Sequence, residues 1–149
     1  MKKKELNIYI SYTWDDKELA DQVSGLLKDR GINSSLSKEK SIPDEPIDEY
    51  IKRMLEKSNY LIALLSPHAY SSSWVRKELE IAFFNKKFKN NVLPIFILDP
   101  MAESSSSQGF SNLPWILKGM KHFNIDSSNK LDKNAKLIVD ELLKVTNLY

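Results

Sequence analysis

Trp74 and Glu78 are the two residues whose types and spacing are best suited to chemistry. On a helix, residues four apart lie on one face, so an aromatic ring and a carboxylate would stand side by side. A carboxylate can stabilise a cationic transition state, and an aromatic ring can stack on a substrate or exclude water. From spacing alone, the alternative is that Trp74 packs beneath a loop and that Glu78 is solvated. Glu80 lies about 200° away on the helical wheel, so we expect it to be a surface charge.

Several other kinds of site lack support in the sequence. There is no cysteine, which excludes a disulfide framework, a thiolate metal site and a cysteine nucleophile. The two histidines, His68 and His122, have no partner at metal-ligand spacing, so we expect loop or surface residues and no metal. The glycines form neither a GxGxxG turn nor a phosphate-binding P-loop. They are Gly25, Gly31, Gly109 and Gly119.

Length and charge narrow the class of protein. The chain has 149 residues, 42% of them hydrophobic and 28% charged, which predicts one soluble globular domain over residues 1–149. The 22 basic and 20 acidic residues give a net charge of +2, which argues against nucleic acid as the main partner. The apolar run after Lys2, Lys3 and Lys4 is too short for a signal peptide. The longest apolar stretch elsewhere, Tyr60–Leu65, is far below the ~20 residues of a spanning helix, so we expect a cytoplasmic protein without a membrane partner.

Patterning in the first part of the chain predicts a strand, a helix and a second strand. Residues 6–11 alternate as a strand does. Asp15 and Glu18 suggest a capping box at the start of a helix, which Gly31 ends. Residues 32–36 form a weaker strand candidate, and a polar loop, Ser37–Glu45, follows. The apolar stripe of the helix would be Leu19, Val23, Leu26 and Leu27.

The middle of the chain repeats this alternation. Pro46 suits the first turn of a second helix, and Tyr60–Leu65 is apolar throughout, as in a strand buried on both faces. The run Ser71-Ser72-Ser73 can cap a third helix. The apolar face of the second helix would be Ile47, Ile51, Met54 and Leu55, and that of the third Val75, Leu79, Ala82 and Phe83.

The last part adds two strands and a helix. Residues 91–98 predict a fourth strand, 99–112 a loop, and 121–125 a short fifth strand. The final helix would bury Ala135, Ile138, Val139, Leu142 and Val145. Strands alternating with helices predict βαβ units and a parallel sheet, for which the doubly wound order 2-1-3-4-5 with helices on both faces is the natural choice.

This strand order predicts where a site should lie. Open parallel sheets bind ligands at the carboxyl ends of their strands, at the point where the order reverses. Here that point lies between the first and third strands, where residues 11–16 and 67–78 meet. We therefore expect Trp74 and Glu78 to face this cleft, with Ser11 and Tyr12 at its edge.

Three blocks of sequence resemble the Toll/interleukin-1 receptor (TIR) domain family. The first is Ile8-Tyr9-Ile10-Ser11-Tyr12 with Asp15 and Asp16 behind it. The second is Leu64-Leu65-Ser66-Pro67 followed by Tyr70, Ser73, Trp74 and Glu78-Leu79, in which the pattern S-x-W-x-x-x-E-L is the most telling part. The third is Asn91-Val92-Leu93-Pro94-Ile95-Phe96. They occur in family order over roughly the first two-thirds of the chain.

The resemblance implies a flavodoxin-like three-layer fold and two kinds of function. Some members are catalytically silent adaptors that assemble through TIR–TIR contacts. Others hydrolyse NAD or cyclise it to ADP-ribose isomers, using the glutamate of the W-x-x-x-E block. That glutamate corresponds to Glu78 and the tryptophan to Trp74, with NAD as substrate and no further cofactor. The candidate substrate-binding residues are Ser11, Tyr12, Trp14, Ile47 and Trp74.

The loop after the second strand departs from the family. Residues 37–45 occupy the place of the BB loop, which borders the NAD site and mediates assembly. Where members often carry an aromatic residue and an aspartate, this chain has Ser35 and Ser37. The loop glycine is replaced by a segment with Asp44 and Glu45. These changes concern the loop geometry and leave Glu78 in place.

The sequence thus favours an NAD-consuming TIR enzyme that resembles bacterial stand-alone members, such as those of Thoeris antiphage systems. Because no effector domain is evident, its output would pass through a diffusible product to a separate effector protein, or through a partner. The alternative is a non-catalytic TIR adaptor. A response-regulator-like domain is disfavoured, because a receiver needs an aspartate where this chain has Leu65-Ser66-Pro67.

Overall fold

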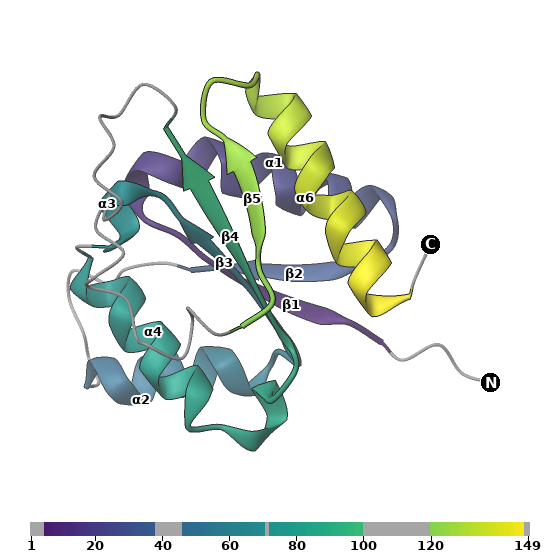
Figure 1. Ribbon diagram of the computed structural model, residues 1–149. Coiled ribbons are helices and arrows are strands. Elements are labelled where there is room, and N and C mark those ends of the chain that lie inside the picture. The colour runs from purple at the N-terminus through teal and green to yellow at the C-terminus, as the bar shows by residue number, and fades with distance from the viewer. Residues whose placement is uncertain (1–4, 38–45, 71, 100–119, 148–149) are drawn as a thin grey trace.

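Five parallel strands form one sheet in the order β2-β1-β3-β4-β5 (Figure 1). The computed structural model describes residues 5–37, 46–70, 72–99 and 120–147, without the side chains of Ile47, His68 and Tyr70. The predicted strand order is confirmed. The strands are Asn7–Ser11 (β1), Asn33–Leu36 (β2), Tyr60–Leu65 (β3), Val92–Leu98 (β4) and Phe123–Asp126 (β5).

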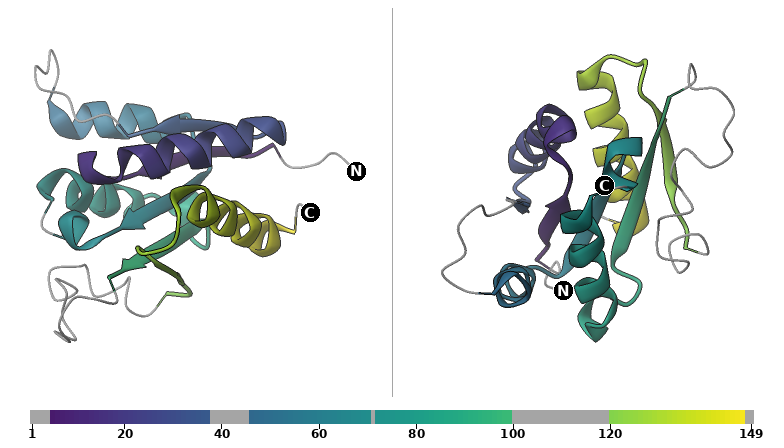
Figure 2. Two further views of the ribbon diagram at one scale, coloured as in Figure 1. Left: turned by 90° about the horizontal axis from the view of Figure 1, so that it is seen from above. Right: turned by 90° about the vertical axis from the view of Figure 1, so that its left-hand side faces the viewer.

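Helices cover both faces of the sheet, which gives the predicted three layers. Helices α1 and α6 lie on one face and α2 and α4 on the other (Figures 1 and 2). Their bounds are Lys17–Asp29 (α1), Ile47–Glu56 (α2), Ser73–Phe83 (α4) and Leu131–Thr146 (α6). Three short elements were not predicted: a 3-10 turn at Trp14–Asp16 (η1), a helical turn at Pro67–Tyr70 (α3) and a 3-10 turn at Lys86–Phe88 (η2).

Each face of the sheet has its own hydrophobic core. Successive strand residues point to opposite faces, so Ile8 and Ile10 of β1 pack toward α1 and α6. Tyr9 packs toward α2 and α4, and Ser11 shares its face by the same alternation. Strand β3 is buried along its whole length, as its apolar sequence predicts. Consequently the polar side chains of Tyr9 and Ser11 point into the layer that holds α4.

The predicted apolar stripes are largely confirmed. Most of their members are buried, while Leu26, Met54, Phe83 and Val145 at the stripe edges are only partly buried. Gly31 ends α1 with a φ of +73°, a left-handed conformation that glycine adopts without a side-chain clash. Ser72 caps α4 by accepting a hydrogen bond from the backbone of Val75 at 3.2 Å.

The capping box predicted for α1 is wrong. Asp15 lies in the turn η1, and the helix begins at Lys17 with Asp16 as its N-cap residue. The Asp16 side chain makes no capping bond, because it instead accepts hydrogen bonds from Thr13 at 3.3 Å and from Ser66 at 2.5 Å. This contact with Ser66 ties the end of β3 to the turn that follows β1.

Strand β2 is short and only partly buried. It pairs with β1 through Leu36, opposite Ile10, and the next residue, Ser37, donates its backbone N–H to the carbonyl of Ile10 at 2.9 Å. This bond extends the pairing by one residue and carries the Ser37 side chain into the interior, where it is 4% exposed. Within the described residues, no helix is long and apolar enough to cross a bilayer.

Candidate functional site

The Glu78 carboxylate lies in the interior of the domain and is surrounded by hydroxyl groups. Its side chain is fully buried on α4. Oε1 accepts a hydrogen bond from Ser11 Oγ at 2.9 Å, and Oε2 accepts one from Ser37 Oγ at 2.7 Å and another from the Tyr9 hydroxyl. The donors come from β1 and from the end of β2, so α4 is tied to two neighbouring strands through one carboxyl group.

Trp74 joins the same cluster through Ser37. Its indole Nε1 donates to Ser37 Oγ at 2.9 Å, while that oxygen donates its own proton to Glu78. The Trp74 ring is 5% exposed and lies 6.1 Å from the Tyr50 ring, centre to centre, at an interplanar angle of 46°. The tryptophan and the glutamate therefore share one helix face, as their spacing predicts. Both side chains are buried, and the loop 38–45, which would border the predicted cleft, lies outside the described residues.

Burial controls the electrostatics of the site. Loss of solvation raises the pKa of Glu78 to about 7, although the hydrogen bonds from Tyr9, Ser37 and Ser11 favour the charged form and lower it. Burial and the neighbouring carboxylate hold the pKa of Tyr9 far above its ordinary value, so its hydroxyl stays protonated and remains a donor. The carboxyl group can therefore exchange a proton near neutral pH.

The other predicted substrate-binding residues are distributed differently. Ser11 contacts Glu78 directly. Tyr12 packs against the core on the opposite face of the sheet, the one covered by α1 and α6. Trp14 is 79% exposed in η1, with the Lys17 ammonium 6.0 Å from its ring centre. Ile47 begins α2, and its side chain is not described. Only Ser11 and Trp74 are thus shown in the Glu78 cluster.

Sequence reasoning missed two members of the cluster, Tyr9 and the side chain of Ser37. The signal for Tyr9 was present, because strand alternation puts it on the same face as Ser11. Ser37 was noted only as a departure from the family pattern. Its position could have been found from the pairing of the second strand with the first, which brings the residue after Leu36 beside the end of β1. The rest of the predicted loop, residues 38–45, lies outside the described residues, as do 100–112 of the later loop.

The described part of the chain contains no group of three or more histidine, aspartate or glutamate side chains that could hold a metal ion. His122 is exposed, with Nδ1 3.0 Å from the carbonyl of Met120 and its ring edge-on to Phe96. Lys77 forms an ion pair with Asp48 at 3.1 Å, which links α4 to α2 at the surface.

Comparison with known proteins identifies the family. The sequence model of the TIR domain matches residues 8–133, so the chain belongs to the TIR domain family. That span includes every member of the Glu78 cluster. No curated protein matches the chain significantly.

Solved TIR domains share the fold. The TIR domain of the Toll-related receptor TRR-2 from Hydra magnipapillata is 20% identical, with a TM-score of 0.62 over 94% of this chain and 97% of that one. The RPS4 and RRS1 TIR domain heterodimer gives 19% identity and a TM-score of 0.68 over 97% and 99%. The TIR domains of the activated Roq1 resistosome give 15% and 0.62 over 94% and 98%. At these identities the likeness establishes the flavodoxin-like fold.

Proposed function

We propose that this TIR domain cleaves the nicotinamide–ribose bond of NAD and that Glu78 is its catalytic carboxylate. The observation that carries the proposal is the Glu78 carboxyl group itself. It lies in the W-x-x-x-E block of the family, its pKa is about 7, and it is held at both oxygens by hydroxyl donors. A group with a strongly shifted pKa and a fixed orientation is a candidate for function.

One carboxylate is enough for this chemistry. Nicotinamide is cationic in NAD and leaves as a neutral molecule, so its departure needs no general acid of the kind that ordinary glycoside cleavage uses. The remaining task is to stabilise the positive charge that develops on the ribose. The Glu78 carboxylate does this through its charge and by accepting hydrogen bonds from ribose hydroxyls. Attack by water at the ribose carbon yields ADP-ribose and a proton, and attack by an adenine nitrogen yields a cyclic product.

The hydroxyl groups around Glu78 suggest how the substrate engages it. Tyr9, Ser11 and Ser37 donate to the carboxylate in the same way as a pair of ribose hydroxyls would. Because Glu78 is fully buried here, binding requires at least one of these donors to be exchanged for a hydroxyl of the substrate. Ser37 is the member best suited to exchange, since it follows the short edge strand β2 rather than lying within β1. Trp74, released from Ser37, would then border the nicotinamide.

A specific observation also favours the second candidate, a non-catalytic adaptor. The carboxylate is satisfied by three internal donors and is closed to solvent, as in a polar network that only fixes α4 against β1. Similar structures include the RPS4 and RRS1 TIR heterodimer and the TIR domains of the Roq1 resistosome, in which TIR domains act in assemblies. Self-association of this chain would use the loop 37–45. Exposed Trp14 is a second candidate contact. It follows the carboxyl end of β1, just as the loop 37–45 follows the carboxyl end of the neighbouring strand β2.

In the enzymatic role, the biological setting would be antiphage signalling in bacteria, with the product acting on a separate effector protein. The test is to incubate concentrated protein with NAD and to identify the products by mass spectrometry, beside Glu78→Gln. We expect nicotinamide with ADP-ribose or a cyclic isomer, and a loss of roughly 100-fold or more in rate for the variant. Turnover by folded Glu78→Gln at the wild-type rate would refute the assignment of Glu78. Absence of turnover in both proteins at high concentration would favour the adaptor.

A further inference from the structure

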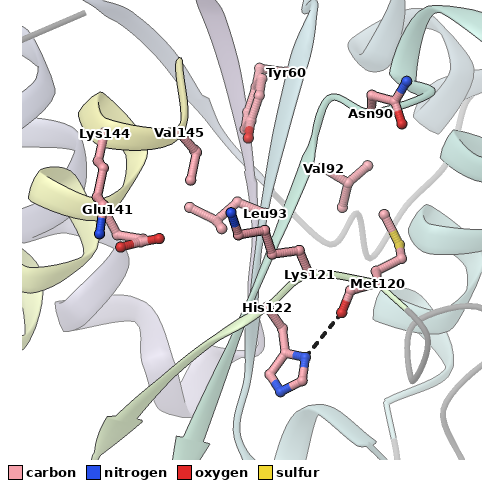
Figure 3. Close-up of a pocket in the computed structure, with 10 residues that line it drawn as sticks. All are labelled: Tyr60, Asn90, Val92, Leu93, Met120, Lys121, His122, Glu141, Lys144 and Val145. Carbon is pink, nitrogen blue, oxygen red and sulfur yellow. Dashed lines mark hydrogen bonds between the residues drawn. The ribbon is translucent and has the colours of Figure 1, made fainter. Parts of the chain in front are cut away.

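A second concave site is lined by the ten residues drawn in Figure 3. It lies at the amino ends of the strands, whereas Glu78 contacts Ser11 at the carboxyl end of β1. We call it the amino-end cavity, because its residues stand at or just before the first residues of β3, β4 and β5 and on the last turns of α6. It has a volume of about 790 Å³, within the range of about 300–1,000 Å³ that small-molecule sites occupy. Its lining includes Tyr60, Asn90, Leu93, Lys121, Glu141 and Lys144.

The Tyr60 hydroxyl gives the amino-end cavity a hydrogen-bond donor. Tyr60 is only 7% exposed, and its side chain points into the cavity (Figure 3). Among the described residues its hydroxyl has no hydrogen-bond partner. Burial and the nearby Glu141 carboxylate raise the pKa of Tyr60 to about 12, so the hydroxyl is a donor at neutral pH. In the described part of the chain the buried side-chain atom without a partner is Ser58 Oγ, so the Tyr60 hydroxyl is open to the cavity and can donate to a ligand atom there.

Within the described residues, the charged side chains around the cavity have no ion-pair partner. Lys121, Lys144 and Glu141 form no ion pair with another residue in the described part of the chain. The Lys121 amine and the Glu141 carboxylate project toward the middle of the cavity, below Tyr60 (Figure 3). Two ammonium groups and one carboxylate give the cavity a net positive charge, which favours an anionic ligand. The Glu141 carboxylate in turn favours a ligand that also carries a hydrogen-bond donor.

The remaining walls fit the body of such a ligand. Val92 and Leu93 at the start of β4, and Val145 on α6, give an apolar surface between the charges. Asn90, held in a left-handed conformation with a φ of 67°, adds an amide at one side. A neighbouring hollow of about 370 Å³ shares Tyr60, Asn90 and Val145 with this cavity, which leaves room for a ligand longer than one ring.

We propose that the amino-end cavity is a binding site for a small organic anion, one with an aromatic or apolar body, a carboxylate or phosphate, and an N–H or O–H donor. The anionic group contacts Lys121 and Lys144, the body packs on Leu93, and the donor faces Glu141. Catalytic sites of open parallel sheets lie at the carboxyl ends of the strands. A ligand at the amino ends is therefore separate from NAD cleavage, and its binding does not depend on the proposed function.

Binding can be measured on the full chain by NMR with matched probes. AMP and indole-3-acetate supply a phosphate and a carboxylate, and adenosine and indole-3-acetamide are their uncharged counterparts. We expect at least one anion to bind saturably, with shift changes at Tyr60, Lys121 and Glu141, and its neutral counterpart to bind at least about tenfold more weakly, as expected when a charged hydrogen bond is lost.

Variants separate this site from general surface charge. The double variant Lys121→Gln with Lys144→Gln should weaken the bound anion at least about tenfold, and Tyr60→Phe should weaken it without unfolding the chain. Lys52→Gln with Lys133→Gln removes two exposed lysines outside the cavity and should leave binding unchanged. The proposal is overturned if neither anion binds up to millimolar concentration, if the neutral probes bind equally well, or if both lysine pairs have the same effect.

Discussion

The Tyr9 hydroxyl donates a hydrogen bond to Oε2 of Glu78 across 69 residues of sequence. The bond joins the central part of β1 to α4 inside the layer that α2 and α4 form. In the proposed mechanism Tyr9 is therefore a positioning residue, which acts through Glu78. Because its hydroxyl stabilises the charged form of the carboxyl group, it also opposes part of the effect of burial on the pKa of Glu78.

Tyr9→Phe should raise the pKa of Glu78 above its value of about 7. The substitution removes one donor to the carboxylate and keeps the ring that fills the core, so the charged form becomes less favourable. Carboxyl ¹³C shifts of Glu78, followed from pH 5 to pH 9, measure this without any substrate. Tyr60→Phe is the matched control, since it removes the hydroxyl of a buried tyrosine that belongs to the core on the other face of the sheet, and it should leave the titration unchanged. An unaltered titration in Tyr9→Phe would show that the bond does not tune the carboxylate.

The pH dependence of turnover follows from the same titration. If the carboxylate form stabilises the cationic ribose, kcat/KM should rise with pH through about 7 and then level off. Tyr9→Phe should move this rise to higher pH and by the same amount as the NMR titration. A rate that falls as Glu78 ionises would show that the protonated form acts, which contradicts the proposed electrostatic role while leaving the positioning role of Tyr9 intact.

The stability of the fold should also depend on pH. Glu78 titrates at about 7 in the folded protein and at its ordinary value of 4.5 when unfolded, so the folded state binds the proton more tightly. The contribution of Glu78 to the free energy of unfolding is fully present below pH 4.5 and is lost as the pH rises through about 7. The loss is on the order of 3 kcal/mol. Urea denaturation at pH 5 and pH 8 measures this loss. Wild type should lose more free energy of unfolding between the two pH values than Glu78→Gln, because the glutamine amide does not titrate. Equal losses in the two proteins would rule out the contribution of Glu78.

The sheet could be predicted from the sequence because each strand carries its own local signal. The apolar run of β3 follows from burial on both faces, and the alternation of β1 separates the apolar side chains that face α1 and α6 from Tyr9 and Ser11, which face α4. Short connections then leave few strand orders. The start of α1 was harder to predict. The carboxylate of Asp16 binds Ser66, which is 50 residues away, and no local capping rule contains that partner.

The candidate site shows the same limit. The relation between Trp74 and Glu78 is local to one helix, so their spacing was informative. Their burial depends on Tyr9 and Ser37, which reach the carboxylate from two other elements. A pattern that marks a carboxylate on a helix face does not reveal whether that face meets solvent or a set of internal donors. For that reason the shared helix face could be predicted from the sequence, whereas the burial of both side chains could not.

Trp74 allows its packing role to be separated from its hydrogen bond. Trp74→Ala should lower the free energy of unfolding by about 3–5 kcal/mol, since the ring is almost wholly buried. Trp74→Phe should retain most of that packing and lose only the bond from Nε1 to Ser37, at a cost of about 1 kcal/mol. Thermal melts beside NAD turnover distinguish the roles. If both variants keep normal specific activity per folded molecule, the tryptophan is a core residue only.

Activity should depend on self-association through the loop 37–45. This segment carries charges of both signs, including Asp44 and Glu45, so a contact made by it should weaken as salt rises. Exposed Trp14, in the turn after β1, could add apolar area to such a contact. If the contact joins different surfaces of two copies, it is heterologous and can continue into a filament. Specific activity should then increase with protein concentration, together with light scattering.

Charge reversal tests this dependence directly. Asp44→Lys with Glu45→Lys should reduce both light scattering and turnover, because the loop would lose its acidic half. Glu56→Lys with Asp140→Lys changes the net charge equally at exposed positions on α2 and α6, and it should leave both measurements near the wild-type values. The prediction fails if specific activity is independent of concentration in a protein that sedimentation shows to be monomeric. That outcome would not refute the role of Glu78. Within a single domain the substrate itself would displace Ser37 from the carboxylate, and Glu78→Gln tests that chemistry separately.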